Sequence, residues 1–172
     1  MQQVELSSHS TTPCAAVSRL TATIALPETG WMELAYELEG DLSALRWPTT
    51  AAGRHDDLWQ HTCFEAFVMP VGSLSYREFN LAPPQTWACY DFTGCRTGMH
   101  NAPIEAPLMH VESSANLYRL RTRLPLPGVG PSQVALAVVL EHADGLLSYW
   151  AVHHPSAEPD FHDPTAFTLQ LG

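Results

Sequence analysis

An acidic residue interrupts one of the most apolar runs of the sequence. Glu65 stands inside Cys63–Met69, and the residues on either side of it place bulk on both faces of the expected strand. A carboxylate is costly to bury without a partner, so Glu65 must reach a polar pocket or a cation. We expect it to be at least partly buried and hydrogen-bonded to an Asn, an Arg or a backbone donor. Its role is either ligand contact or an ion pair with Arg77 or Arg96.

A second acid and an amide occur in the segment Tyr76–Leu81. Asn is depleted in strands, so Asn80 requires a partner, which is either a turn ahead of Pro83 or a bound ligand. Glu78 precedes it by two residues. Together with Glu65 it could form the carboxylate pair of a glycoside hydrolase, which requires a separation of roughly 5 to 10 Å. The sequence leaves that distance open.

Two aromatic residues lie in polar loops. Trp59 belongs to the loop 54–61, and Phe161 belongs to the Pro-bounded loop 153–165. Exposed aromatic planes suit sugar rings, whose C–H faces pack on π systems while acids and amides bind the hydroxyls. Packing at the rim of the core is the alternative for each ring.

The same two loops are rich in potential metal ligands, but their spacing matches no firm metal motif. These residues are His55, Asp56, Asp57 and His61 in the first loop, and His153, His154, His162 and Asp163 in the second. No HExxH motif and no GxSxG nucleophile elbow occurs. The choice between surface or capping histidines and a metal-dependent enzyme stays open, the metal is unknown, and no catalytic residue is assigned.

Short apolar or alternating segments must position these residues. Candidate strands are 19–26, 31–39, 42–47, 63–69, 76–81, 86–92, 109–113, 117–124, 134–140, 147–152 and 166–171, with a long connection at 94–107. No segment longer than ten residues shows a clean helical period. About ten strands with regular turn signals predict an all-β, immunoglobulin-like antiparallel β-sandwich. We expect residues 1–14 to be a flexible N-terminal segment and 15–172 to form one domain.

Composition excludes several function classes. The chain has 172 residues, a formal net charge of -10 and eight basic residues, all of which are Arg. Without Lys there is no Walker-type phosphate loop and no Schiff-base lysine. An acidic chain lacks the basic surface that nucleic acids or anionic membranes require, so we expect neither partner.

The cysteines and the apolar runs indicate a cellular location. Cys14, Cys63, Cys89 and Cys95 form no CxxC pair, which favours reduced, mostly buried thiols. No apolar run approaches the roughly 18 residues of a membrane span, and the first residues do not resemble a secretory signal. The expected location is cytoplasmic, and the oligomeric state is open.

Two segments resemble a known family of sugar-binding domains. LWQHTCFEAFV (58–68) is similar to a strand of family 9 carbohydrate-binding modules and their DOMON-like relatives, and residues 148–167 resemble the closing segment of that family. The segment ending in Asn80 corresponds to a strand that also ends in Asn. The order agrees over about residues 15 to 171, and the LWQHTCFEAF block is closest to bacterial DOMON-like proteins.

The resemblance implies a β-sandwich that binds a small ligand, either a sugar or haem. By correspondence, Trp59 and Phe161 match the two aromatic residues that clamp a sugar in the family, Glu65 matches its acid and Asn80 its amide. The family has Arg where this chain has Glu78 and where it has His162, so the sugar preference of the family does not carry over. Haem-binding relatives use Met and His; Met69, Met99, Met109, His100 and His110 are available here, but no motif selects a pair.

We therefore predict a non-catalytic module for a small, sugar-like ligand, without a cofactor. The predicted ligand-binding residues are Trp59, Glu65, Glu78, Asn80, Phe161 and His162. Trp59 and Phe161 are expected to face each other across a cleft at an end of the sandwich. The alternatives are a haem-binding or redox DOMON-like domain, a metal-dependent enzyme that uses the His/Asp loops, or an interaction domain that binds protein.

Overall fold

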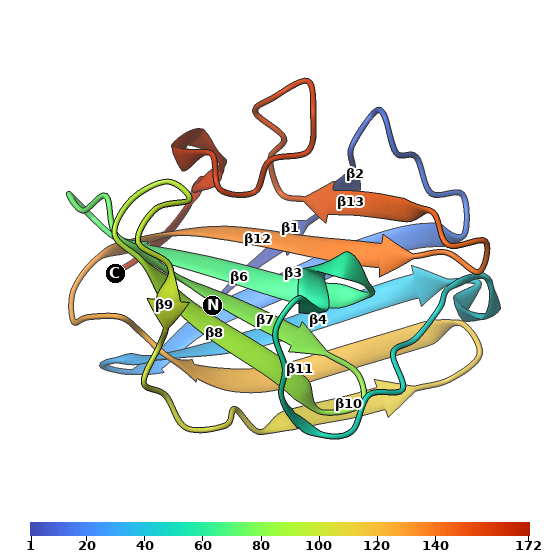
Figure 1. Ribbon diagram of the computed structural model, residues 1–172, viewed down its shortest axis with the longest axis horizontal. Helices are drawn as coiled ribbons and strands as arrows, with labels where there is room; N and C mark the ends of the chain where they lie inside the picture. The colour runs from blue at the N-terminus through green and yellow to red at the C-terminus, as the bar shows by residue number, and fades with distance from the viewer.

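The computed structural model describes residues 1–172 as a sandwich of two β-sheets (Figure 1). The five-stranded sheet has the order β1 (Gln2–Glu5), β3 (Val17–Glu28), β4 (Trp31–Gly40), β11 (Leu117–Pro125), β10 (Met109–Ser113). The nine-stranded sheet has the order β2 (Ser7–Ser8), β13 (Leu147–Ala151), β12 (Ser132–Glu141), β6 (Cys63–Pro70), β7 (Tyr76–Ala82), β8 (Thr86–Phe92), β5 (Gly53–Arg54). β14 (Leu169–Leu171) also pairs with β12, and β9 (His100–Asn101) with β8. The predicted all-β sandwich is confirmed.

Period-two alternation decides which side chains enter the core. In β4 every second residue is buried, from Met32 to Leu38, while the residues between them are more exposed. Successive side chains of a strand point to opposite faces, so this pattern supplies one apolar face to the sandwich. The main cluster of 31 buried residues fills the space between the two sheets.

The nine-stranded sheet is apolar on both faces. Along β6, Phe64, Ala66 and Val68 belong to the main core, while Cys63 and Phe67 belong to a second cluster of 16 buried residues. The second cluster therefore lies on the outer face of this sheet. Chain segments that connect the strands cover part of that face, among them the 3-10 turn η2 (Leu58–Gln60), which Figure 1 shows in front of β6 and β7.

Some predicted elements differ from the structure. Residues 42–47, predicted as a strand, contain the 3-10 turn η1 (Leu42–Ala44). The predicted last strand, 166–171, begins at the end of the turn η3 (Pro164–Ala166), and only Leu169–Leu171 forms a strand. The long connection 94–107 contains the short strand β9. One pairing, β5 with β8, is parallel. Very short strands such as β2, β5 and β9 raise the number of strands above the predicted ten. A strand of two residues is too short to show an alternating pattern in the sequence.

The N-terminal residues 1–14, which were expected to form a flexible segment, contain the two strands β1 and β2. β1 pairs with β3, and β2 pairs with β13. Leu6, which lies between β1 and β2, is only 2% exposed. The segment thus joins the edges of both sheets.

The cysteines form no disulfide bond. All four cysteines are free, and three of them are buried, so the predicted burial of most thiols is confirmed. No helix is long and apolar enough to cross a membrane.

Candidate functional site

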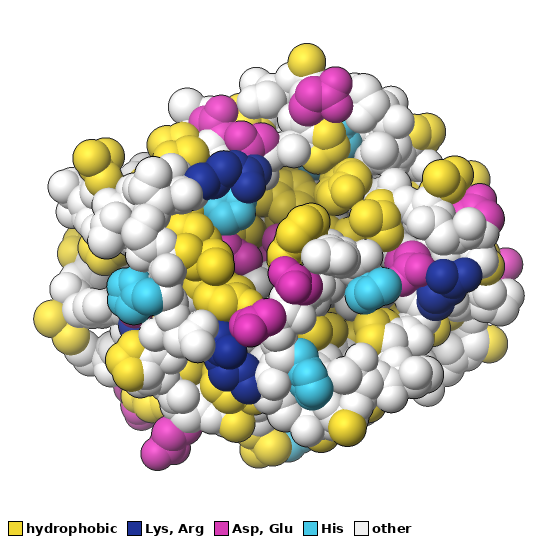
Figure 2. Space-filling model, in the orientation of Figure 1, with side chains coloured by type: hydrophobic (Ala, Val, Ile, Leu, Met, Phe, Trp, Pro, Cys, Tyr) yellow, Lys and Arg dark blue, Asp and Glu magenta, His cyan; other side chains and the backbone are white.

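A cavity lies over the outer face of the nine-stranded sheet. Across β13, β12, β6, β7 and β8, the directly paired residues are Ala151, Ala137, Glu65, Asn80 and Ala88. Direct cross-strand partners share one face of a sheet. A cavity of about 790 Å³ opens over this face, and Glu65 belongs to its lining. Figure 2 shows this hollow, with acidic side chains in and beside it.

Two glutamates and an asparagine form the polar floor of this cavity. Glu65, Glu78 and Asn80 are 3%, 5% and 1% exposed. Asn80 Nδ2 donates to Glu78 Oε1 at 2.6 Å, and Asn80 Oδ1 lies 3.7 Å from the thiol of Cys63. Glu65 Oε1 is buried and has no hydrogen-bond partner. Because such an atom costs about 1–3 kcal/mol, Glu65 offers an unused acceptor to a ligand.

Burial raises the pKa of both floor carboxyls. The pKa of Glu65 lies well above its usual value, mainly because of burial and secondly because of the charge of Glu78. Burial raises the pKa of Glu78 to about 7, although the hydrogen bond from Asn80 opposes the shift. Two carboxyls in one low-dielectric site resist double ionisation. The pair therefore retains a proton near neutral pH.

A chain of polar contacts leads from the cavity rim to Glu78. The backbone N–H of Arg96 donates to the Tyr76 hydroxyl at 3.3 Å, and this hydroxyl lies 2.6 Å from His162 Nδ1. Burial lowers the pKa of His162 to about 4, so its ring is neutral at pH 7. The Tyr76 hydroxyl then donates to Nδ1, which assigns the ring proton to Nε2. His162 Nε2 lies 3.7 Å from Glu78 Oε2 and faces the acid.

Two residues at the rim hold unusual backbone conformations. Asp57 (φ 60°) and Arg96 (φ 52°) are the non-glycine residues with positive φ, and both line the cavity. This region costs roughly 1–3 kcal/mol for such residues, and it is enriched at binding sites. Asp57 directly precedes η2, which carries Trp59. The indole of Trp59 lines the same cavity and the residue is 49% exposed.

A second polar network anchors the loop that carries Trp59. Glu141 in β12 binds two side chains through its two carboxylate oxygens. Arg46 Nη1 lies 2.7 Å from Oε1, and His61 Nδ1 lies 2.7 Å from Oε2. Thr62 Oγ1 donates to the Arg46 carbonyl at 2.7 Å and accepts from the Glu141 N–H at 3.1 Å. Both ends of the segment 46–62 are therefore fixed to β12, which limits the positions open to Trp59.

The structure brings the predicted site residues together. Five of the six line this cavity, namely Trp59, Glu65, Glu78, Phe161 and His162. The sixth, Asn80, hydrogen-bonds the floor acid Glu78. The cavity lies over the outer face of a sheet, however, and not at an end of the sandwich as predicted. Its acids Glu65 and Glu78 lie within β6 and β7, and not in the loops at the ends of these strands.

Phe161 has the packing role that the sequence analysis gave as the alternative for each ring. It is only 9% exposed. Its ring centroid lies 6.5 Å from that of Phe67 and 6.1 Å from that of Tyr149. It thus belongs to the second apolar cluster and forms a wall of the cavity, whereas Trp59 is the exposed ring.

Two expectations for Glu65 are corrected, and one is confirmed. The residue is buried, as predicted. It pairs with neither candidate cation, because Arg77 and Arg96 form ion pairs with aspartates elsewhere. The amide of Asn80 reaches Glu78 instead of Glu65. Glu78 and Asn80 lie two residues apart on the same face of β7.

Sequence reasoning missed several residues of the cavity. Tyr90 and Phe92 of β8, Val139 of β12 and Tyr149 of β13 all line it. Their strands were predicted, and alternation alone would have grouped Tyr90 with Phe92. Their place beside Glu78 depends on the pairing of Glu78 with Tyr90, which no single strand encodes.

The loop histidines do not assemble a metal site. No group of three or more His, Cys, Asp or Glu side chains is arranged to hold a metal ion. His55 lies 2.9 Å from the Ala51 carbonyl, and His154 lies 2.8 Å from the Ser7 carbonyl. These contacts account for both rings as local structural features.

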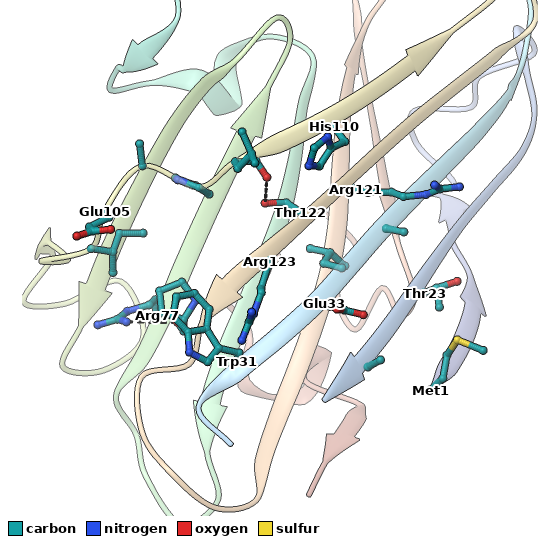
Figure 3. Close-up of a pocket in the computed structure, with 18 of the residues that line it drawn as sticks. Met1, Thr23, Trp31, Glu33, Arg77, Glu105, His110, Arg121, Thr122 and Arg123 are labelled. Atoms are coloured by element: carbon teal, nitrogen blue, oxygen red, sulfur yellow. Dashed lines mark hydrogen bonds between the residues drawn. The ribbon is translucent and has the colours of Figure 1, made fainter. Parts of the chain in front are cut away.

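A second, larger cavity of about 1030 Å³ lies over the outer face of the five-stranded sheet (Figure 3). Trp31 is 37% exposed there, and the Arg123 guanidinium lies 4.6 Å from its ring centroid. Arg123 also pairs with Glu28, and Arg77 forms two hydrogen bonds to Asp91. No buried polar side-chain atom in its lining lacks a partner. The cavity over the nine-stranded sheet is therefore the better candidate site.

Comparisons with known proteins place the fold. No family model and no curated protein sequence matches this chain. A Bacteroides uniformis protein, provisionally described as carbohydrate-binding, superposes with a TM-score of 0.66 at 16% identity, covering 95% of this chain and 84% of that one. A family 9 carbohydrate-binding module from Caldicellulosiruptor kristjanssonii matches at 9% identity, in complex with glucose (TM-score 0.51; 86% and 73% covered) and with cellotriose (0.52; 86% and 72%). The chain thus has a β-sandwich like that of family 9 modules.

Proposed function

We propose that this chain is a non-catalytic binding module that holds a small carbohydrate in the cavity over the nine-stranded sheet. The observation that carries the proposal is the combination of an exposed indole at the rim with an unpartnered acceptor at the floor. Trp59 offers an aromatic face to the C–H side of a sugar ring, and Glu65 Oε1 can accept a hydrogen bond that no protein group donates. Sugar hydroxyls can donate such a bond. The carbohydrate-binding neighbours in fold support the same ligand class.

The position of the carboxyl pair favours binding over hydrolysis. Glycoside hydrolysis uses two carboxyls that flank the scissile bond. Glu65 and Glu78 belong to neighbouring strands and project from one face of one sheet, where Glu65 is paired with Asn80 and Glu78 with Phe67. They would meet a ligand from the same side. Both are suited to accept hydrogen bonds from it.

Two tryptophan variants test the site. A panel of mono- and disaccharides is titrated by calorimetry and by tryptophan fluorescence. Trp59→Ala is expected to weaken binding about tenfold, since an aromatic contact of about 1.5 kcal/mol corresponds to that factor. Trp31→Ala is the matched control, because this indole is similarly exposed but lies over the other sheet. Equal affinities for Trp59→Ala and wild type, or no binding by any sugar, would contradict the proposal.

A further inference from the structure

The cavity over the nine-stranded sheet is acidic and largely lacks compensating cations. Its lining contains four carboxylic side chains and one guanidinium. That guanidinium, of Arg96, is 57% exposed and pairs with Asp160 at 2.8 Å. The imidazole of His162, whose Nε2 lies 3.7 Å from Glu78 Oε2, is neutral because burial lowers its pKa to about 4. Burial raises the pKa of Glu78, the charge of Arg96 lowers it only in part, and no cation forms an ion pair with Glu65.

A neutral sugar would leave this imbalance unresolved. A hydroxyl can donate one hydrogen bond to Glu65 Oε1, but it cannot stabilise the doubly ionised pair, so the pair keeps its proton when a neutral sugar binds. A protonated amine carries three donors and a positive charge. It can serve the unpartnered oxygen of Glu65 and the remaining lone pairs of Glu78 at once. Charge-assisted hydrogen bonds of this kind are roughly twice as strong as neutral ones.

We propose that the ligand of this cavity is a cationic amino sugar, whose ammonium group binds between Glu65 and Glu78 while its ring packs on Trp59. This inference rests on the proposed carbohydrate-binding function and specifies its ligand class. The observations behind it are the burial of both acids on neighbouring strands, the unpartnered Oε1 of Glu65 and the absence of a paired cation at the floor.

Binding of an ammonium group should release a proton. The carboxyl pair retains a proton near pH 7, as the raised pKa values of Glu65 and Glu78 indicate. A positive charge between the two groups favours the doubly ionised pair, so the retained proton leaves to the buffer. A neutral sugar provides no such driving force. Proton release therefore distinguishes the two kinds of ligand independently of affinity.

The experiment compares D-glucosamine and 6-amino-6-deoxy-D-glucose with D-glucose and N-acetyl-D-glucosamine by calorimetry at pH 7. Each titration is run in two buffers of different ionisation enthalpy, which reports the protons released. At least one amine is expected to bind ten times more tightly than D-glucose or more, with proton release. The N-acetyl sugar controls for the size of the substituent and should bind no better than D-glucose.

A charge-neutral variant tests the assignment to the floor acids. Glu78→Gln keeps the shape and the acceptor for Asn80 but removes the charge. It should reduce the affinity for the preferred amine to within about twofold of that for D-glucose. Glu5→Gln is the control, because it removes the same net charge from the exposed surface of β1. The control should retain the preference of the wild type.

The outcomes separate this inference from the proposed function. Equal binding of D-glucose and the amines, without proton release, overturns the inference and leaves the carbohydrate-binding proposal in place. An amine preference that persists in Glu78→Gln also overturns the inference. Failure of every sugar to bind overturns both. If cyclohexylamine binds as tightly as the amino sugars, the carbohydrate part of both proposals is wrong.

Discussion

Glu78 and His162 make opposite contributions to the pH dependence of folding stability. Burial raises the pKa of Glu78 from 4.5 to about 7, so the native state holds this proton more tightly than the unfolded chain. Stability from Glu78 is then complete below about pH 4.5 and is lost as the pH rises to about 7. Burial lowers the pKa of His162 from 6.5 to about 4, so its contribution is lost as the pH falls through that range. The two effects partly cancel in the wild type.

Glu78→Gln is expected to expose the hidden contribution of the acid. In the wild type, ionisation of Glu78 lowers the folding stability between about pH 5 and pH 8. The variant has no carboxyl at this position and does not undergo this loss. The variant should therefore gain roughly 2–3 kcal/mol relative to wild type over this interval, the equivalent of about two pKa units. The charge of Glu78 also raises the pKa of Glu65, so its removal acts in the same direction. Urea unfolding at pH 5, 6.5 and 8 measures this difference.

The control for this measurement is Glu5→Gln, which changes the net charge equally at an exposed position. Its stability should run parallel to that of the wild type at all three pH values. Parallel curves for Glu78→Gln as well would mean that Glu78 titrates as an ordinary, solvated carboxyl. Its place at the buried floor of the cavity would then be wrong.

At the scale of elements, the sequence predicts strands well and their neighbours poorly. β8 (Thr86–Phe92) was predicted with its observed bounds, because its apolar run is closed by clear turn signals. Residues 42–47 were predicted as a strand, but Leu42 and Leu45 are three residues apart and are both buried by a 3-10 turn. Asp41 caps that turn through Ser43. Local capping outweighed strand propensity there.

The candidate site was predictable in its residues but not in its geometry. Alternation places Glu65 and Phe67 on one face of β6, and a family resemblance marks the loop with Trp59. The floor arises only when β12, β6 and β7 lie side by side, because Ala137, Glu65 and Asn80 then form one row. Strand order is set by contacts between residues far apart in the sequence. Periodicity within one strand contains no information on it.

Glu141→Ala tests how the 46–62 segment is held. The substitution removes the acceptor shared by Arg46 and His61. Since both partners are more than half exposed, the expected loss of stability is small, about 1 kcal/mol. The local effect should be larger: amides of residues 46–61 should exchange hydrogen faster, and sugar affinity should fall as Trp59 becomes less restricted.

Glu37→Ala is the matched control for Glu141→Ala. It removes a carboxylate that pairs with Arg119 on the five-stranded sheet, far from this loop in the strand order. Hydrogen exchange at 46–61 should not change in the control. Unchanged exchange in Glu141→Ala would show that strand and core contacts alone position the loop.

At the scale of the whole molecule, the N-terminal segment joins the two sheets. β1 extends the edge of the five-stranded sheet along β3, and β2 extends the nine-stranded sheet along β13. The crossing point is Leu6, which is buried in the core between them. Thr11 and Thr12, a few residues later, line the candidate site. The same N-terminal segment thus contacts both sheets and contributes residues to the wall of the cavity.

Leu6→Ala is the decisive substitution for this role. Truncation of a buried leucine costs roughly 2–5 kcal/mol when the surroundings cannot collapse, and Leu6 is 2% exposed. Because both sheets contact the segment, the loss should appear in a single cooperative transition, with circular dichroism and tryptophan fluorescence giving the same midpoint. Leu26→Ala is the control, since that side chain is 39% exposed and should cost less than about 1 kcal/mol. A similarly small loss for Leu6→Ala would agree with the expectation of a flexible segment 1–14. Separate midpoints for the two probes would mean that the sheets unfold independently.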